Sequence, residues 1–162
     1  MTSLPVNVLQ LNKYDVWNIK ESEHDYHFQV EAKTPIACEE CGVEGEFVRF
    51  GKRDVAYRDL HIHGKRVTLW VVRRRYTCRA CGKTFRPALP DMADDHRMTR
   101  RLYSYVEKKA FNHPYAYVAD TTGLDEKTIR DIFKKKAEFL AIWHRFETPR
   151  CLGIDELYLN RR

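Results

Sequence analysis

The sequence predicts an α+β chain in which a β-rich N-terminal half is followed by a helical half. Three observations predict this division. Alternating apolar and polar runs occupy 14–33 and 46–77, apolar residues recur at helical spacing from 98 to 143, and a Pro-containing stretch at 87–96 separates the two patterns. With 162 residues, 43% hydrophobic and 32% charged, the composition excludes a wholly disordered chain and a large multidomain enzyme.

The β-rich half is predicted to contain a hairpin and a longer ribbon. Two short alternating runs flank a polar stretch at 21–25, which is typical of antiparallel strands. This hairpin is acidic, so we expect it to pack on the next module rather than touch nucleic acid. Residues 46–57 and 66–77 are two longer strand-like runs, joined around 61–64. Alternate positions of the second run should face a core, namely Val67, Leu69 and Val71.

The helical half is predicted to contain three helices. The first covers 98–111, the second ends at Gly123, and the third begins at Asp125, which is a good N-cap residue. After Pro149, residues 151–154 have the composition of a buried strand, with Asp155 at its end. We expect 87–96 to be the linker between the two halves.

Positive charge is concentrated in one region of the chain. Residues 49–86 carry twelve basic and two acidic side chains, a net charge of +10, whereas residues 1–48 carry three basic and nine acidic ones. This excess favours a surface for a polyanion. The alternative is a solvated ribbon whose basic residues provide solubility.

Four cysteines form two CxxCG pairs, which begin at Cys38 and Cys78 and end at Cys41 and Cys81. Two such turns can direct four sulfurs to the corners of a tetrahedron, the closed geometry of a structural Zn²⁺ site. A disulfide pairing and an iron–sulfur cluster are the alternatives. The fifth cysteine, Cys151, has no partner and is expected to be a core residue. No secretory signal or membrane anchor is visible, so a reducing cytoplasm is expected.

Two segments are candidates for contacts with duplex DNA. The first is the strand segment Arg73, Arg74 and Arg75, which we expect to contact phosphate; Arg73 and Arg75 should share one face of the strand. The second is a helix-turn-helix over 117–132, with a small residue at the helix crossing and Gly123 in the turn. An ordinary helical hairpin is its alternative.

If 117–132 is a helix-turn-helix, its second helix supplies the contacts to DNA. Lys127 and Arg130 are then candidates for base edges, and Thr128 and Lys134 for phosphates. Asp131 is expected to orient Arg130.

The order of these motifs resembles the bacterial insertion-sequence transposases of the ISL-three family. The resemblance rests on the double CxxCG ribbon, on the arginine-rich strand 72–78 followed by 83–85, on the helix-turn-helix, and on Leu152-Gly153-Ile154-Asp155-Glu156. It covers the chain from about residue 4 to its C-terminus. It implies a bacterial, nucleoid-associated protein that binds the terminal inverted repeats of its element.

The resemblance also implies four domains and an RNase H-like fold for the last of them. Their boundaries are 1–35 for the hairpin segment, 36–90 for the four-cysteine zinc ribbon, 91–148 for the helix-turn-helix domain, and 149–162 for the start of a truncated catalytic domain. Asp155 would be the first carboxylate of an Asp-Asp-Glu triad that uses a divalent metal such as Mg²⁺. Residues 156–162 supply no counterpart of the other two carboxylates, so this chain alone is not expected to be an enzyme.

Three functions follow as hypotheses. The leading one is sequence-specific binding of terminal inverted repeats, as the DNA-binding part of a transposase. The second is a catalytic subunit completed by another chain, and the third is a zinc-ribbon adaptor for acidic proteins or nonspecific nucleic acid. The partners to expect are double-stranded DNA and either a second copy of the chain or a full-length transposase, without a membrane.

Overall fold

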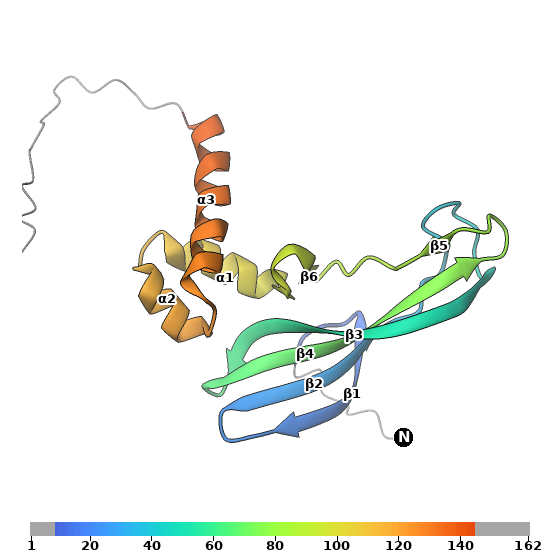
Figure 1. Ribbon diagram of the computed structural model, residues 1–162, viewed down its shortest axis with the longest axis horizontal. Helices are drawn as coiled ribbons and strands as arrows, with labels where there is room; N and C mark the ends of the chain where they lie inside the picture. Colours follow the sequence, from blue (N-terminus) through green and yellow to red (C-terminus); the bar gives the residue numbers. More distant parts are fainter. Residues whose placement is uncertain (1–8, 145–162) are drawn as a thin grey trace, which may run out of the picture.

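The computed structural model describes residues 9–144, which form one twisted sheet and three helices (Figure 1). Its main strand order is β1-β2-β4-β3-β7-β6, and β5 pairs with β4. The strands are β1 (Tyr14–Glu21), β2 (Asp25–Ala32), β3 (Phe47–Ile62), β4 (Lys65–Cys78), β5 (Thr84–Phe85), β6 (Met92–Ala93) and β7 (Met98–Thr99). The helices are α1 (Arg100–Ala110), α2 (Tyr115–Thr122) and α3 (Glu126–Trp143), with a short 3-10 turn η1 (Asp94–His96) before β7.

The predicted hairpin and ribbon are both confirmed, and they share the same sheet. Strands β1 and β2 are antiparallel, as are β3 and β4, while residues 25–31 of β2 pair in parallel with residues 66–72 of β4. The three alternate residues of β4 that were expected to face a core are each at most 1% exposed. They pack with Phe28, Val30 and Tyr57 from the neighbouring strands. Each fully buried side chain of this size contributes about 1.5–3 kcal/mol to folding.

Residues 87–96 join the sheet to the helices, as expected of the linker, but they are also packed against the sheet. Leu89 and Met92 are buried in the core of the sheet, and β6 and η1 lie within the segment. The prolines do prevent a long strand or helix here, but they do not prevent packing. The segment therefore covers the sheet and attaches the helices to it.

The three predicted helices are present, with one boundary changed. Met98 and Thr99 form strand β7 rather than the first turn of α1. Thr99 is the N-cap of α1 because its hydroxyl oxygen accepts a hydrogen bond from the Leu102 amide at 3.3 Å. Gly123 ends α2 in the left-handed conformation, with φ 67°, as its position predicts.

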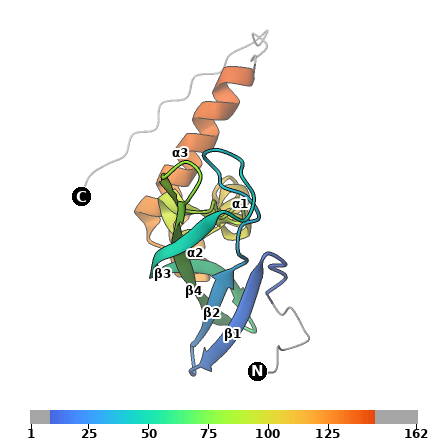
Figure 2. The ribbon, with the colours of Figure 1, turned by 90° about the vertical axis from the view of Figure 1, so that its right-hand side faces the viewer.

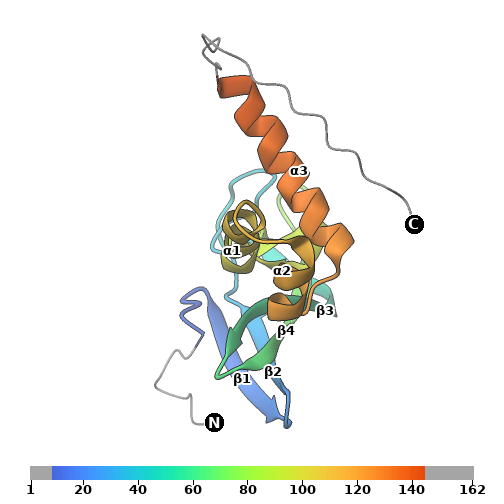
Figure 3. The same ribbon diagram turned by 90° about the vertical axis from the view of Figure 1, so that its left-hand side faces the viewer.

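The helices pack together at one end of the β3–β4 ribbon and the cysteine loops lie at the other (Figure 1). The core of the three helices contains Leu102 and Val106 of α1, Val118 of α2, and Ile129 and Ile132 of α3. Views from the two sides show that α3 extends away from the sheet beyond the other helices (Figures 2 and 3). Within residues 9–144, no helix is both long and apolar enough to cross a membrane. The predicted strand 151–154, Cys151 and Asp155 lie outside the described residues.

Candidate metal centre and nucleic-acid interface

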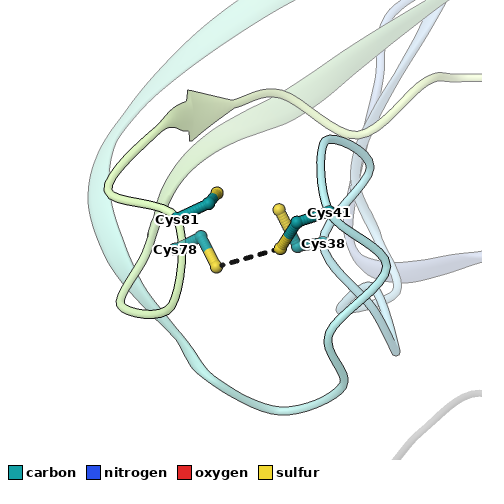
Figure 4. A group of neighbouring side chains, drawn as sticks. All are labelled: Cys38, Cys41, Cys78 and Cys81. Carbon is teal, nitrogen blue, oxygen red and sulfur yellow. Dashed lines mark hydrogen bonds between the residues drawn. The ribbon is translucent and has the colours of Figure 1, made fainter.

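The four cysteines of the two CxxCG pairs come together at the tip of the ribbon (Figure 4). All four sulfurs lie within 4.8 Å of one another, and the sulfurs of Cys41 and Cys78 are 3.7 Å apart. Four thiolates that bind one Zn²⁺ at about 2.3 Å are separated by about 3.8 Å, the edge of the tetrahedron. The cysteines are therefore positioned for zinc binding.

The backbone of the two pairs has the same local geometry, which explains how they aim at one point. The Gly42 amide donates to the Cys38 carbonyl at 2.8 Å, and the Gly82 amide donates to the Cys78 carbonyl at 3.0 Å. Both glycines have positive φ, 75° and 70°, where a side chain would be strained. The glycine after each pair is therefore required by the turn.

Ionisation of the cluster also fits a cation. The amide of Cys81 lowers the pKa of the Cys78 thiol to about 7. The Val43 amide favours the Cys41 thiolate, but burial and the neighbouring sulfurs outweigh it and raise the pKa of Cys41 to about 12. Four thiolates cannot coexist here unless a cation compensates their charge. Zn²⁺ bound by all four has no open coordination position, so it would hold the fold rather than perform chemistry.

An aromatic cluster supports the metal centre. Phe47, Tyr76 and Phe85 lie with their ring centroids 5.3–5.7 Å apart, in edge and stacked contacts. Two of the cysteines, Cys38 and Cys78, are buried against them. This cluster shares no residue with the cores of the sheet and of the helices. The tip of the ribbon is thus a separate packing unit that depends on few apolar side chains.

The second candidate site is the pair α2 and α3, which is joined by a turn at 123–125. Val118, Ile129 and Ile132 are fully buried and fix the two helices against α1. The N-cap of α3 is Asp125, whose carboxylate accepts from the Thr128 amide at 2.8 Å. This arrangement is that of a helix-turn-helix, in which the exposed start of the second helix faces DNA.

The predicted contact residues of α3 divide into two groups. Lys127, Arg130 and Lys134 are on the side of α3 away from its buried residues, where Lys127 and Arg130 are exposed and Lys134 keeps most of its side chain in solvent. Thr128 is half-buried, and its hydroxyl donates to the Asp125 carboxylate at 2.7 Å, so it helps to cap the helix. The expected pairing of Asp131 with Arg130 is wrong, since these two residues form no ion pair in the described part of the chain.

The cap of α3 gives a first prediction. Replacing Asp125 with Ala should destabilise the protein by about 1 kcal/mol at neutral pH, because two donors at the helix start lose their acceptor. The Thr128 amide holds the pKa of Asp125 below its usual range. Because this pKa is lower in the folded than in the unfolded protein, the Asp125 carboxylate stabilises the folded state above the unfolded pKa of about 4. The stabilisation is lost as the pH falls through the folded pKa. Urea unfolding at pH 7 and pH 3 measures the difference in unfolding free energy between the parent protein and Asp125→Ala. An equal difference at both pH values would contradict the prediction.

The three arginines of β4 have different surroundings. Arg73 is 2.9 Å from Asp94, and Arg74 forms an ion pair with Glu31 whose hydrogen bond lowers the pKa of Glu31. Arg75 has no carboxylate partner among the described residues, and its guanidinium lies 4.7 Å from the centre of the Phe50 ring. Arg73 and Arg75 line the same surface depression, as expected of alternate residues in a strand.

A buried ion pair joins the sheet to the helices, and no pattern in the sequence indicates it. Asp59 of β3 is 2% exposed and accepts from Thr99 at 2.6 Å and from Arg101 Nε at 2.7 Å. Arg101 also forms a second bond to Asp59 and donates to the Leu9 carbonyl. Tyr57 and Arg73 similarly bind Asp94, which lies in η1. The bonds to the two carboxylates join residues 21 to 42 positions apart in the chain, too far for a local motif.

Comparison with protein families gives two matches, both within the described residues. Residues 34–81 match the zinc-finger of transposase IS204/IS1001/IS1096/IS1165. Residues 87–135 match the helix-turn-helix domain of transposase family ISL3. The first match contains all four clustered cysteines, and the second contains α1, α2 and the first half of α3. Comparison with curated proteins and with solved structures gave no match.

Proposed function

Because the chain belongs to the ISL3 family of transposases, we propose that it binds duplex DNA sequence-specifically, at the terminal inverted repeats of an insertion sequence. The observation that carries the proposal is the exposed face of α3 with Lys127, Arg130 and Lys134, held by a buried helix-turn-helix core. An α-helix fits the major groove of B-DNA, where each base pair presents its own pattern of donors and acceptors.

The proposed mechanism assigns each surface one task. The first turns of α3 enter the major groove, where Lys127 and Arg130 donate to base edges and Lys134 donates to phosphate. Arg is suited to guanine because its planar group can donate two parallel hydrogen bonds. Zn²⁺ held by Cys38, Cys41, Cys78 and Cys81 would keep the ribbon folded and take no part in chemistry.

The proposal concerns binding rather than cleavage. Neither family match includes Asp155, which we propose as the first carboxylate of a metal-dependent triad. Accordingly, Asp155→Asn is expected to leave DNA affinity unchanged. Metal-dependent nicking of bound DNA, lost in Asp155→Asn, would instead favour the catalytic subunit.

Titration of labelled duplexes, followed by fluorescence anisotropy, tests the binding proposal. The probes are the flanks of the protein's own gene and scrambled duplexes of the same length, each across a salt series. Tighter binding to one flank at every salt concentration supports recognition of the ends. Equal binding that collapses with salt would leave a nonspecific basic surface, and no binding would favour the adaptor for acidic proteins.

Arg130→Ala is the matching prediction for specificity. The substitution should narrow the difference in binding free energy between the preferred and the scrambled duplex by about 1–3 kcal/mol, since a base contact is lost. Lys135→Ala is the control because it removes the same charge from α3, on the side that faces Asp95 and His96. An unchanged difference in Arg130→Ala would remove this residue from the interface.

A further inference from the structure

Five cations line a depression of about 180 Å³ beside β3. Arg73 is paired with Asp94, and the other four are Lys52, Arg53, Arg75 and Arg86. Within residues 9–144, none of the four makes an ion pair, whereas the ribbon cations Lys65, Arg66, Arg73, Arg74 and Lys83 each have a carboxylate within 3.2 Å. The depression therefore gathers four cations that have no carboxylate within ion-pair distance among the described residues.

The local backbone leaves these charges accessible. Gly51 lies opposite Arg75 and has no side chain that could cover the arginine. The guanidinium of Arg75 lies over the ring of the neighbouring Phe50. A guanidinium held against a ring keeps its planar donors directed outward, which suits a phosphate diester. Arg53 and Arg86 complete a rim with no carboxylate in its lining. The chemistry fits the backbone of a nucleic acid, not a base edge.

The depression is fixed relative to α3. The depression lies on the parts of β3 and β4 near their cysteine end. The helices lie at the other end of the ribbon (Figure 1). Asp59, Thr99 and Arg101 join β3 to the start of α1, and the Arg58 amide donates to the Arg97 carbonyl at 2.9 Å in the same joint. Since a buried hydrogen-bonded ion pair resists rotation, the depression and the exposed face of α3 keep one distance and orientation.

We propose that this depression binds phosphates of the same DNA duplex that α3 contacts, and that the Asp59–Arg101 joint fixes their offset. The protein then contacts two segments of the duplex at one spacing, and only the segment under α3 is read by its base sequence. Asp59 and Arg101 are positioning residues, because they touch no DNA. The inference rests on the proposed function for α3, but the phosphate contact can be tested without it.

The phosphate contact is tested on a random-sequence duplex. In Arg75→Ala/Arg86→Ala, two fewer phosphates are neutralised, so the slope of log K against log salt should become shallower by about 1.8. Raising the salt from 50 to 200 mM reduces the affinity of the parent protein by some factor, and this factor should be about twelvefold smaller for the double variant. Lys20→Ala removes an exposed charge from β1 and should leave the slope unchanged. An unchanged slope in the double variant would overturn the proposal.

The fixed spacing is tested on a duplex selected by the zinc-loaded protein from a random pool. Footprinting should show two protected segments, and replacing the phosphates of the segment under the depression with uncharged methylphosphonates should weaken binding to the level of Arg75→Ala/Arg86→Ala. That double variant should be insensitive to the replacement. In Arg101→Lys, which keeps the charge but loses the bidentate contact, the offset is no longer fixed, so the penalty of the replacement should shrink.

Two results would overturn the spacing inference: a single protected segment, or equal binding with charged and with uncharged phosphates in the second segment. If the pool yields no preferred sequence, the function proposed for α3 fails. The salt slopes still decide the phosphate contact in that case, so the two failures are distinguishable.

Discussion

Replacing Cys78 with Ser is expected to abolish zinc binding and to unfold the tip of the ribbon. A serine hydroxyl is not ionised at neutral pH and does not replace a thiolate ligand, so one corner of the tetrahedron is lost. In small zinc modules, metal binding contributes about 10–16 kcal/mol of apparent free energy, which is also the free energy of folding. The tip has only Phe47, Tyr76 and Phe85 as the large apolar side chains of its described cluster. It has little else to hold it folded.

The unfolding should be local. The sheet buries Val30, Leu69 and Val71 in a cluster that contains no cysteine, and the helices have a separate core. Hydrogen exchange should therefore become fast at 36–47 and 76–86, while the amides of β1, β2 and the helices stay protected. Uniform loss of protection would show that the tip and the sheet unfold as one unit.

Metal content provides the second measurement. The parent protein should contain one zinc per chain and no iron, and Cys78→Ser should contain none. Cys151→Ser is the matched control, because this cysteine belongs to neither CxxCG pair, and it should retain one zinc. Full zinc in Cys78→Ser would contradict the four-ligand assignment, and stoichiometric iron would establish the iron–sulfur alternative.

Local periodicity predicted most of the fold. The two long strands, the hairpin and the three helices follow from alternating or helical spacing of apolar residues, and Gly123 and Asp125 mark their boundaries correctly. The parallel pairing of β2 with β4 was not predictable in this way. It joins segments about 40 residues apart, and nothing within either strand encodes its neighbour.

The errors in the fold have a common origin in the segment that joins the two halves. Prolines in 87–96 indicated a linker, yet Leu89 and Met92 bury their side chains. Apolar spacing placed Met98 in a helix, but Thr99 is needed as its N-cap and its hydroxyl binds Asp59. Packing against a distant strand determined both outcomes, and packing is not visible in local sequence.

The candidate site was predicted unevenly for the same reason. The cysteine cluster is specified by short spacing and a glycine, so it could be predicted in full. The run Arg73, Arg74 and Arg75 could be recognised as basic, but which of the three is paired depends on Asp94 and Glu31, 21 and 43 residues away. The unpaired cations around Phe50 come from three separate segments, so no motif contains them.

Arg101→Met is expected to be the most destabilising substitution of a charged residue in the joint between sheet and helices. It leaves the Asp59 carboxylate, whose side chain is fully buried, without its cation, and such a loss costs about 3–5 kcal/mol. Asp59→Leu should cost less. The Arg101 side chain is 32% exposed, so its charge can be hydrated when the carboxylate is removed.

The double variant Asp59→Leu/Arg101→Met separates the charge from the packing. It removes both ions, so it should be more stable than Arg101→Met alone, even though two residues are changed. Lys83→Met is the control: its ion pair with Glu40 is exposed on both sides and should contribute no more than about 1 kcal/mol. Urea unfolding measures all four. If Arg101→Met and Asp59→Leu cost the same and their effects add, the joint is held by packing. A large loss of stability in Arg101→Met that the double variant relieves would show that the joint depends on Arg101 because of the buried carboxylate. Asp59 is then tolerated in the interior only while the Arg101 cation binds it.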